Sequence, residues 1–182
     1  MRTPELPKAT FVDSSKKLDE MILDLMKEPI VAVDTESNSL YAYKERVCLI
    51  QFSTRTADFL VDPLAFDNLA PLQPLFGNDG IEKVFHAAEY DLICLKRDFG
   101  FKFSNLFDTM VAAGILGYPA LGLGSLLMEE FGVKTNKRYQ RANWGERPLP
   151  AYLKQYAQQD THYLIPLRDR LRESLRKRNL WS

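Results

Sequence analysis

The chain has 182 residues, of which 46% are hydrophobic and 26% are charged, as is ordinary for a globular protein. Lys plus Arg and Asp plus Glu number 24 each, so there is no bulk positive field to attract nucleic acid, and any such binding must depend on local patches. There is no apolar signal segment and no run near the roughly 18 apolar residues that span a membrane. Cys48 and Cys94 lie in apolar runs, as buried free thiols do. We therefore expect a soluble cytoplasmic protein without membrane contact.

The first half of the chain predicts mainly strands. Phe11-Val12 indicates a short strand, and an amphipathic helix that Pro29 ends follows it. Residues 30–33 are apolar and mostly β-branched, which predicts a strand covered on both faces. Two further strands are predicted at 47–53 and 58–61, and the short intervals between them permit antiparallel hairpins.

The second half alternates between strands and helices. In chain order the pattern predicts a strand at 83–85, a helix at 89–99, a strand at 103–107, a helix at 108–116, a helix at 125–131 and one long helix from Pro150 to about Lys177. Antiparallel strands followed by β–α alternation favour an α/β fold with a mixed five-stranded sheet flanked by helices. No linker divides the chain, so we predict one domain over residues 1–182.

Two carboxylates follow directly after the apolar strand at 30–33. Asp34 and Glu36 project from the same face if the strand continues through them, because side chains alternate along a strand. Their mutual repulsion raises the pKa of each, and a divalent cation between them relieves it. Hard oxygen ligands favour Mg²⁺ or Mn²⁺. The alternative is a simple turn whose carboxylates are solvated or act as caps.

A third carboxylate interrupts the apolar stripe of the last helix. Asp160 lies four residues after Tyr156 and four before Leu164, on the buried face. A buried carboxylate is costly unless it is neutralised or bound to a cation, which indicates a metal ligand. Tyr156 lies one turn away, where a phenol could orient a water molecule. The alternative is an Asp that reaches solvent at the edge of the stripe or pairs with an Arg.

A fourth candidate, Asp91, follows the strand at 83–85. It lies in the first turn of a predicted helix, where the helix dipole favours an anion, and that is also its purely structural explanation. Glu89 is a competitor for any role given to Asp91. His86 could face the same cleft, but a lone His is more often structural, so we assign it no catalytic role.

With these residues identified, the chain resembles the DEDD superfamily of 3′→5′ exonucleases, and within it the ribonuclease D-like group. The resemblance is carried by V-D-T-E at 33–36, H-A-A-E-Y-D at 86–91 and Y-A-Q-Q-D at 156–160. Tyr156 is typical of the tyrosine branch, whereas the other branch has a histidine at the position of Gln155. Ala87 departs from the asparagine that many relatives carry there.

The resemblance implies a ribonuclease H-like sheet and a two-metal mechanism that uses Mg²⁺ or Mn²⁺. It implies that Asp34 bridges both ions, that Glu36 and Asp160 complete one site, that Asp91 serves the other, and that Tyr156 positions the attacking water. The expected reaction releases nucleoside 5′-monophosphates from the 3′ end of RNA. The alternatives are a DNA exonuclease of repair and a catalytically silent nucleic-acid-binding module. We expect no C-terminal helical RNA-binding domain in this chain.

A basic and aromatic segment at 134–147 is the predicted contact for a single-stranded 3′ end, with phosphates on the cations and bases on the rings. The alternative is a solvated loop with Trp144 as its core anchor. Leu40, shortly after the first motif, is placed to stack against the terminal base. The predicted substrate contacts are Leu40, Lys137, Arg138, Arg141, Trp144 and Arg147.

Overall fold

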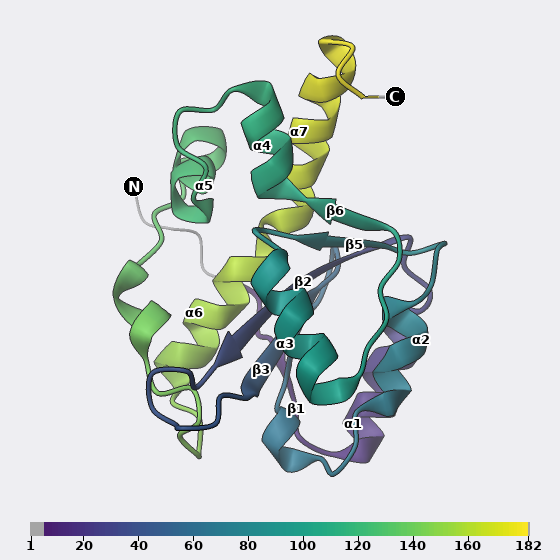
Figure 1. The fold of residues 1–182 in the computed structure, drawn as a ribbon, viewed down its shortest axis with the longest axis vertical. Helices are drawn as coiled ribbons and strands as arrows, with labels where there is room; N and C mark the ends of the chain where they lie inside the picture. Colours follow the sequence, from purple (N-terminus) through teal and green to yellow (C-terminus); the bar gives the residue numbers. More distant parts are fainter. Residues whose placement is uncertain (1–5, 182) are drawn as a thin grey trace.

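A six-stranded mixed sheet forms the centre of the computed structural model, which describes residues 6–181 (Figure 1). Residues 1–5 and 182, the ends of the domain predicted over 1–182, lie outside this range. The strand order is β1-β4-β3-β2-β5-β6. The strands are β1 (Thr10–Val12), β2 (Ile30–Ser37), β3 (Val47–Ser53), β4 (Asp58–Val61), β5 (Glu82–Phe85) and β6 (Leu106–Asp108).

The predicted mixed α/β architecture is confirmed, but the count of five strands is wrong. The sixth strand is β1, which the sequence indicates at Phe11-Val12 but which the predicted count of five leaves out; it pairs in parallel with β4. This pairing covers a sheet edge that would otherwise present free backbone groups. β6 also begins later than the predicted 103–107, because Asn105 adopts the left-handed conformation, with φ 51°, and interrupts the extended backbone before Leu106.

Seven α-helices and three short 3-10 helices surround the sheet in the described part of the chain. The helices are α1 (Ser15–Leu25), α2 (Gln73–Phe76), α3 (Glu89–Phe99), α4 (Thr109–Leu116), α5 (Leu123–Phe131), α6 (Ala151–His162) and α7 (Leu164–Lys177). The 3-10 helices are η1 (Pro63–Ala65), η2 (Ala70–Leu72) and η3 (Lys137–Arg141). Among residues 6–181, none of the helices has the length and apolar character needed to cross a membrane.

The central strand β2 separates two cores. Val31 and Val33 pack in a cluster with buried residues of α1, α2 and α3. Ile30 and Ala32, which point the opposite way, pack with α4, α5 and α7. β2 runs antiparallel to β3 and parallel to β5, so both of its edges are hydrogen-bonded. Its first four residues are therefore buried, and its last four are half-buried where they emerge.

The single long helix predicted from Pro150 to Lys177 is wrong. The structure has two helices there, α6 and α7, with Tyr163 between them (Figure 1). Pro166 explains the break, because its ring would clash with the carbonyl of His162 and it has no N–H to donate there. In the first turn of a new helix the same proline is tolerated.

Candidate active site

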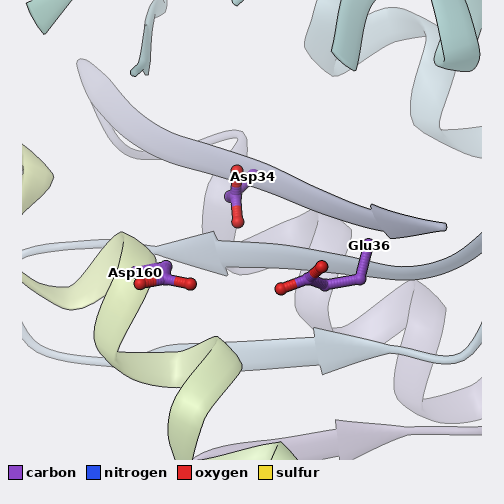
Figure 2. Close-up of side chains that lie close together, drawn as sticks. All are labelled: Asp34, Glu36 and Asp160. Atoms are coloured by element: carbon purple, nitrogen blue, oxygen red, sulfur yellow. The ribbon is translucent and has the colours of Figure 1, made fainter. Parts of the chain in front are cut away.

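Three of the predicted carboxylates meet where β2 emerges from the sheet. Asp34 and Glu36 come from β2 and Asp160 from α6, and the three side chains point toward one another (Figure 2). One oxygen of each lies within 4.8 Å of the others, a grouping that could hold a metal ion. Residues more than 120 positions apart in the chain thus build one acidic cluster, which we call the carboxylate cluster.

The strand and the helix that build the cluster are held together by packing and by a buried hydrogen bond. Ser53 on β3 and Thr161 on α6 are joined by a hydrogen bond of 2.7 Å between their hydroxyls. Leu153 and Ala157 of α6 pack in a cluster with Leu49 of β3. Because α6 is fixed against the sheet in this way, Asp160 faces the two acids of β2.

The electrostatics of the cluster favour a cation. Burial raises the pKa of Asp34 well above its usual range, and the charges of Asp91 and Asp160 raise it further. Burial likewise raises the pKa of Glu36, with added contributions from Asp34 and Asp160. Burial raises the pKa of Asp160 to about 7, although a hydrogen bond from Tyr156 acts in the opposite direction. A divalent cation would remove the repulsion that these carboxylates otherwise impose on one another.

Asp91 lies beside the cluster rather than within it. It is in the first turn of α3, as predicted, and only 7% exposed. Thr35 Oγ1 donates a hydrogen bond of 2.5 Å to Asp91 Oδ1. Burial raises the pKa of Asp91 to about 6, and the hydrogen bond from Thr35 partly offsets this. Thr35 was not identified from the sequence, although it stands between two predicted site residues.

Tyr156 packs against the cluster from α6. Its ring contacts Tyr139 edge-on at a centroid distance of 5.8 Å and Trp144 at 6.0 Å. Burial raises the pKa of the Tyr156 phenol, and the charges of Asp160 and Glu36 raise it further. The predicted pairing of Tyr156 with Asp160 one turn apart is therefore present in the structure.

The cluster opens into a cavity of about 410 Å³. Its walls also include residues that the sequence did not single out, among them Met110, the start of α5 at Gly122 to Gly124, Thr135 and Gln140. His86 lies in the wall as well, with Nδ1 2.9 Å from the hydroxyl oxygen of Thr109. That contact gives His86 a hydrogen-bond partner within the fold.

The turn before Asp91 is strained at Ala87. This residue adopts the left-handed conformation, with φ 58°, which asparagine tolerates better than alanine. Asp108 holds the turn, since its carboxylate accepts hydrogen bonds from the backbone N–H groups of Ala87 and Ala88 at 3.1 and 2.8 Å. The departure from the family pattern at Ala87 therefore costs backbone strain and leaves the position of Asp91 intact.

Two predicted substrate contacts have side chains that are engaged within the fold instead, Trp144 in the core and Arg147 in an ion pair, which corrects the prediction. Trp144 is only 1% exposed and packs behind Tyr156, so it has no free face for a base. Arg147 forms a two-pronged ion pair with Asp62, with N–O distances of 2.8 and 2.6 Å, and donates to the carbonyl of Cys48 at 2.7 Å. Its guanidinium is thereby occupied within the fold.

The other predicted contacts remain at the surface. Arg138 and Arg141 of η3 are exposed, and Leu40 is 65% exposed. The Tyr41 hydroxyl donates a hydrogen bond of 2.7 Å to the carbonyl of Arg141, which joins the loop after β2 to η3. Lys137 begins η3, and its side chain lies outside what the structure describes.

Known proteins match most of this chain. A family model described as 3′-5′ exonuclease matches residues 9–176. The exosome complex exonuclease RRP6 of Saccharomyces cerevisiae is 42% identical over 170 residues, which cover 93% of this chain and 23% of the yeast protein. The chain thus spans less than a quarter of the length of that relative.

Two solved structures have the same fold. The catalytic core of RRP6 from Trypanosoma brucei, in its C496S mutant, gives a TM-score of 0.92 at 41% identity, over 99% of this chain and 52% of that one. Escherichia coli RNase D gives a TM-score of 0.90 at 27% identity, over 96% of this chain and 47% of that one. These matches confirm the resemblance found in the three motifs, and the chain belongs to the 3′-5′ exonuclease family, in the DEDD superfamily with RRP6 and ribonuclease D.

Proposed function

We propose that this chain is a divalent-metal-dependent exoribonuclease that removes nucleoside 5′-monophosphates from the 3′ end of single-stranded RNA. The observation that carries the proposal is the carboxylate cluster, in which one oxygen of each of three acids lies within 4.8 Å of the others. Burial raises the pKa of all three, and the charge of Asp160 raises the pKa of Asp34 and Glu36 further. Holding several carboxylates close together in a partly buried place destabilises the metal-free protein. Binding of cations by the cluster explains why these acids are present.

The residues present fit two Mg²⁺ or Mn²⁺ ions. Every donor in the cluster is a carboxylate oxygen, the ligand type that these ions prefer. Asp34, Glu36 and Asp160 would hold one ion, and Asp91 with Asp34 would hold the other. When bound, the ions supply an activated water molecule and stabilise the leaving 3′ oxygen.

The protein's own side chains would orient the reactants. The Tyr156 phenol is hydrogen-bonded to Asp160 and held from behind by Trp144, so its hydroxyl has a fixed direction at the cavity. Leu40 would stack against the terminal base, and Arg138 and Arg141 would bind phosphates. The hydrogen bond from the Tyr41 hydroxyl to the Arg141 carbonyl joins the loop after β2, which carries Leu40, to η3, which carries the two arginines.

RNA is favoured over DNA by the relatives. The yeast relative is an exonuclease of the exosome complex, and E. coli RNase D is an exoribonuclease involved in structured RNA processing. A DNA exonuclease of the same mechanism is the alternative. The cytoplasmic location expected from the sequence stays a prediction, which microscopy of the tagged protein would test.

The decisive experiment uses 5′-labelled single-stranded RNA, the matched DNA and a tRNA-like 3′ end, each with Mg²⁺, with Mn²⁺ or with EDTA. We expect stepwise shortening of RNA from the 3′ end, release of nucleoside 5′-monophosphates, and no reaction in EDTA. Faster cleavage of DNA would favour the alternative substrate. Intact RNA and DNA in both metals, together with no metal binding by calorimetry, would leave a silent binding module as the explanation.

A further inference from the structure

A glutamine side chain is buried without a hydrogen-bond partner beside the carboxylate cluster. Gln51 of β3 is 0% exposed. Within residues 6–181, neither its amide nitrogen nor its amide oxygen has a hydrogen-bond partner. Leaving a buried amide unpaired destabilises the fold, so a glutamine at a fully buried position calls for a reason.

The sheet register places Gln51 next to Asp34. The two residues are paired across β2 and β3, and cross-strand partners project from the same face of a sheet with their Cβ atoms about 4.5–5.5 Å apart. Gln51 thus shares the face from which Asp34 reaches the cluster, although it does not line the cavity wall.

The neighbours of Gln51 along β3 place it beneath α6. Ser53, two residues on, is hydrogen-bonded to Thr161, and Leu49, two residues back, packs in a cluster with Ala157. Gln51 therefore lies under the turn of α6 between Ala157 and Thr161, which carries Asp160. The cross-strand partner of Gln51 on its other side is Leu60, a core residue of the same cluster as Leu49.

Packing alone would favour an apolar residue at this position. Leu49, Leu60 and Ala157 surround it with apolar groups, and a leucine of similar volume needs no hydrogen bonds. The polar residue that the sheet register places beside it is Asp34, an acid of the cluster. A carboxylate that binds a cation with one oxygen still needs donors for its other oxygen, and partners of this kind orient metal ligands.

We propose that Gln51 is a positioning residue of the metal centre: its amide N–H donates to the Asp34 carboxylate when that carboxylate binds a cation. The proposal rests on the proposed metal-dependent function. It explains a polar residue in an apolar setting by a hydrogen bond that forms in the metal-bound protein. A merely structural Gln51 would instead contribute equally to the metal-free and metal-bound protein.

The test compares Gln51→Leu with the parent protein in two measurements. The first is the melting temperature in EDTA, which we expect to be unchanged or raised because an unpaired buried amide is removed. The second is Mn²⁺ binding by isothermal titration calorimetry, where we expect the Kd to weaken about tenfold or more, as for other outer partners of metal ligands. Gln155→Leu, an exposed position on α6, is the matched control and should change neither value.

The outcomes separate the two proposals. If Gln51→Leu lowers the melting temperature in EDTA and binds Mn²⁺ with parental affinity, Gln51 serves only the fold and this inference is wrong. If the parent protein itself binds no Mn²⁺ and cleaves no RNA, the proposed function fails instead. Should the leucine variant not fold, Gln51→Met, which keeps the length of the side chain without an amide, decides between the same two results.

Discussion

Two acids beside α6, the buried Asp58 and the half-buried Asp160, have opposite environments. Asp58 of β4 accepts hydrogen bonds from Gln158 at 2.7 Å and His162 at 2.9 Å. Burial acts to raise the pKa of Asp58, but these bonds outweigh it and the pKa is lowered. Asp160, from the same stretch of α6, faces Asp34 and Glu36, and its pKa is raised to about 7.

The difference shows how burial alone fails to distinguish a structural acid from a functional one. Asp58 Oδ2 accepts from two donors of α6, so its charge is stabilised by the fold and ties α6 to the sheet. Asp160 has one donor, Tyr156, and faces two other acids, so a cation from outside the chain would offset the remaining negative charge. The sign of the neighbouring groups therefore separates an anchor from a cation site more clearly than the depth of the carboxylate does.

The largest expected effect is on catalysis, from Asp160→Asn. Metal ions stabilise the transition state by several kcal/mol, and 1.36 kcal/mol is a factor of ten, so we expect kcat/KM on single-stranded RNA to fall roughly a thousandfold. The melting temperature in EDTA should be unchanged or higher, because a buried charge among like charges is lost. Near-parental activity would show that Asp160 is not a metal ligand and would contradict the difference drawn between Asp58 and Asp160.

A large effect on stability is expected from Asp58→Ala. A hydrogen bond to a charged group contributes about 1.5–3 kcal/mol, and this variant removes the acceptor of two such bonds. Each kcal/mol lowers the melting temperature of a chain of this size by about 2–4 °C. Thermal unfolding followed by circular dichroism would measure the change. RNA cleavage well below the melting temperature should stay within a few-fold of the parent, and a thousandfold loss there would show that Asp58 belongs to the reaction.

The two acids should also respond to pH in opposite directions in EDTA. The pKa of Asp160 is about 7 in the folded protein, above the ordinary value near 3.9, so the folded state holds the proton more tightly and stability falls as pH rises from about 4 to 7. The melting temperature of Asp160→Asn minus that of the parent should therefore be small at pH 4 and grow toward pH 7.

Asp58 provides the opposite case for the same experiment. Its pKa is lowered, so it contributes stability above its ordinary pKa that is lost as the pH falls. The stability lost in Asp58→Asn relative to the parent should accordingly be larger at pH 7 than at pH 3. Parallel curves for the two variants would contradict the assignment of one acid to the fold and the other to a cation.

The smallest effect is expected at the surface, from Arg138→Ala with Arg141→Ala. Exposed cations bind phosphates weakly, so KM for RNA should rise a few-fold while kcat is retained. The slope of log affinity against log salt should fall by about 0.7 for each phosphate contact that is lost. Lys96→Ala, an exposed cation in the last turn of α3, is the control and should leave that slope unchanged.

The carboxylate cluster could be predicted because its residues break simple patterns. Asp34 and Glu36 end an apolar strand, and Asp160 interrupts an apolar stripe, so each carries a cost that a cation explains. Asp91 and the branch assigned from Tyr156 depended on resemblance. Thr35 and Gln51 were missed, because a threonine within a strand breaks no pattern and the glutamine interrupts an apolar strand without bringing a charge into it.

Each wrong prediction from the sequence can be traced to the physical effect of a single residue. Pro166 divides the last helix, although the apolar stripe continues through it. Trp144 and Arg147 belong to a basic and aromatic segment, but composition does not tell which members turn inward. Arg147 turns inward because it forms an ion pair with Asp62. The two residues are far apart in the chain, so this ion pair could not be predicted from the sequence.

Successive side chains of β2 point to opposite sides of the sheet, and this alternation determines where the site can tolerate an inserted residue. Asp34 and Glu36 leave one side of the strand, and Thr35, which holds Asp91, leaves the other. One residue inserted within 30–34 would exchange the two sides and turn the acids toward α3. The loop at 38–46 lies beyond the strand, so insertions there would leave this arrangement in place. A scan of single insertions should thus find a sharp boundary at the end of β2.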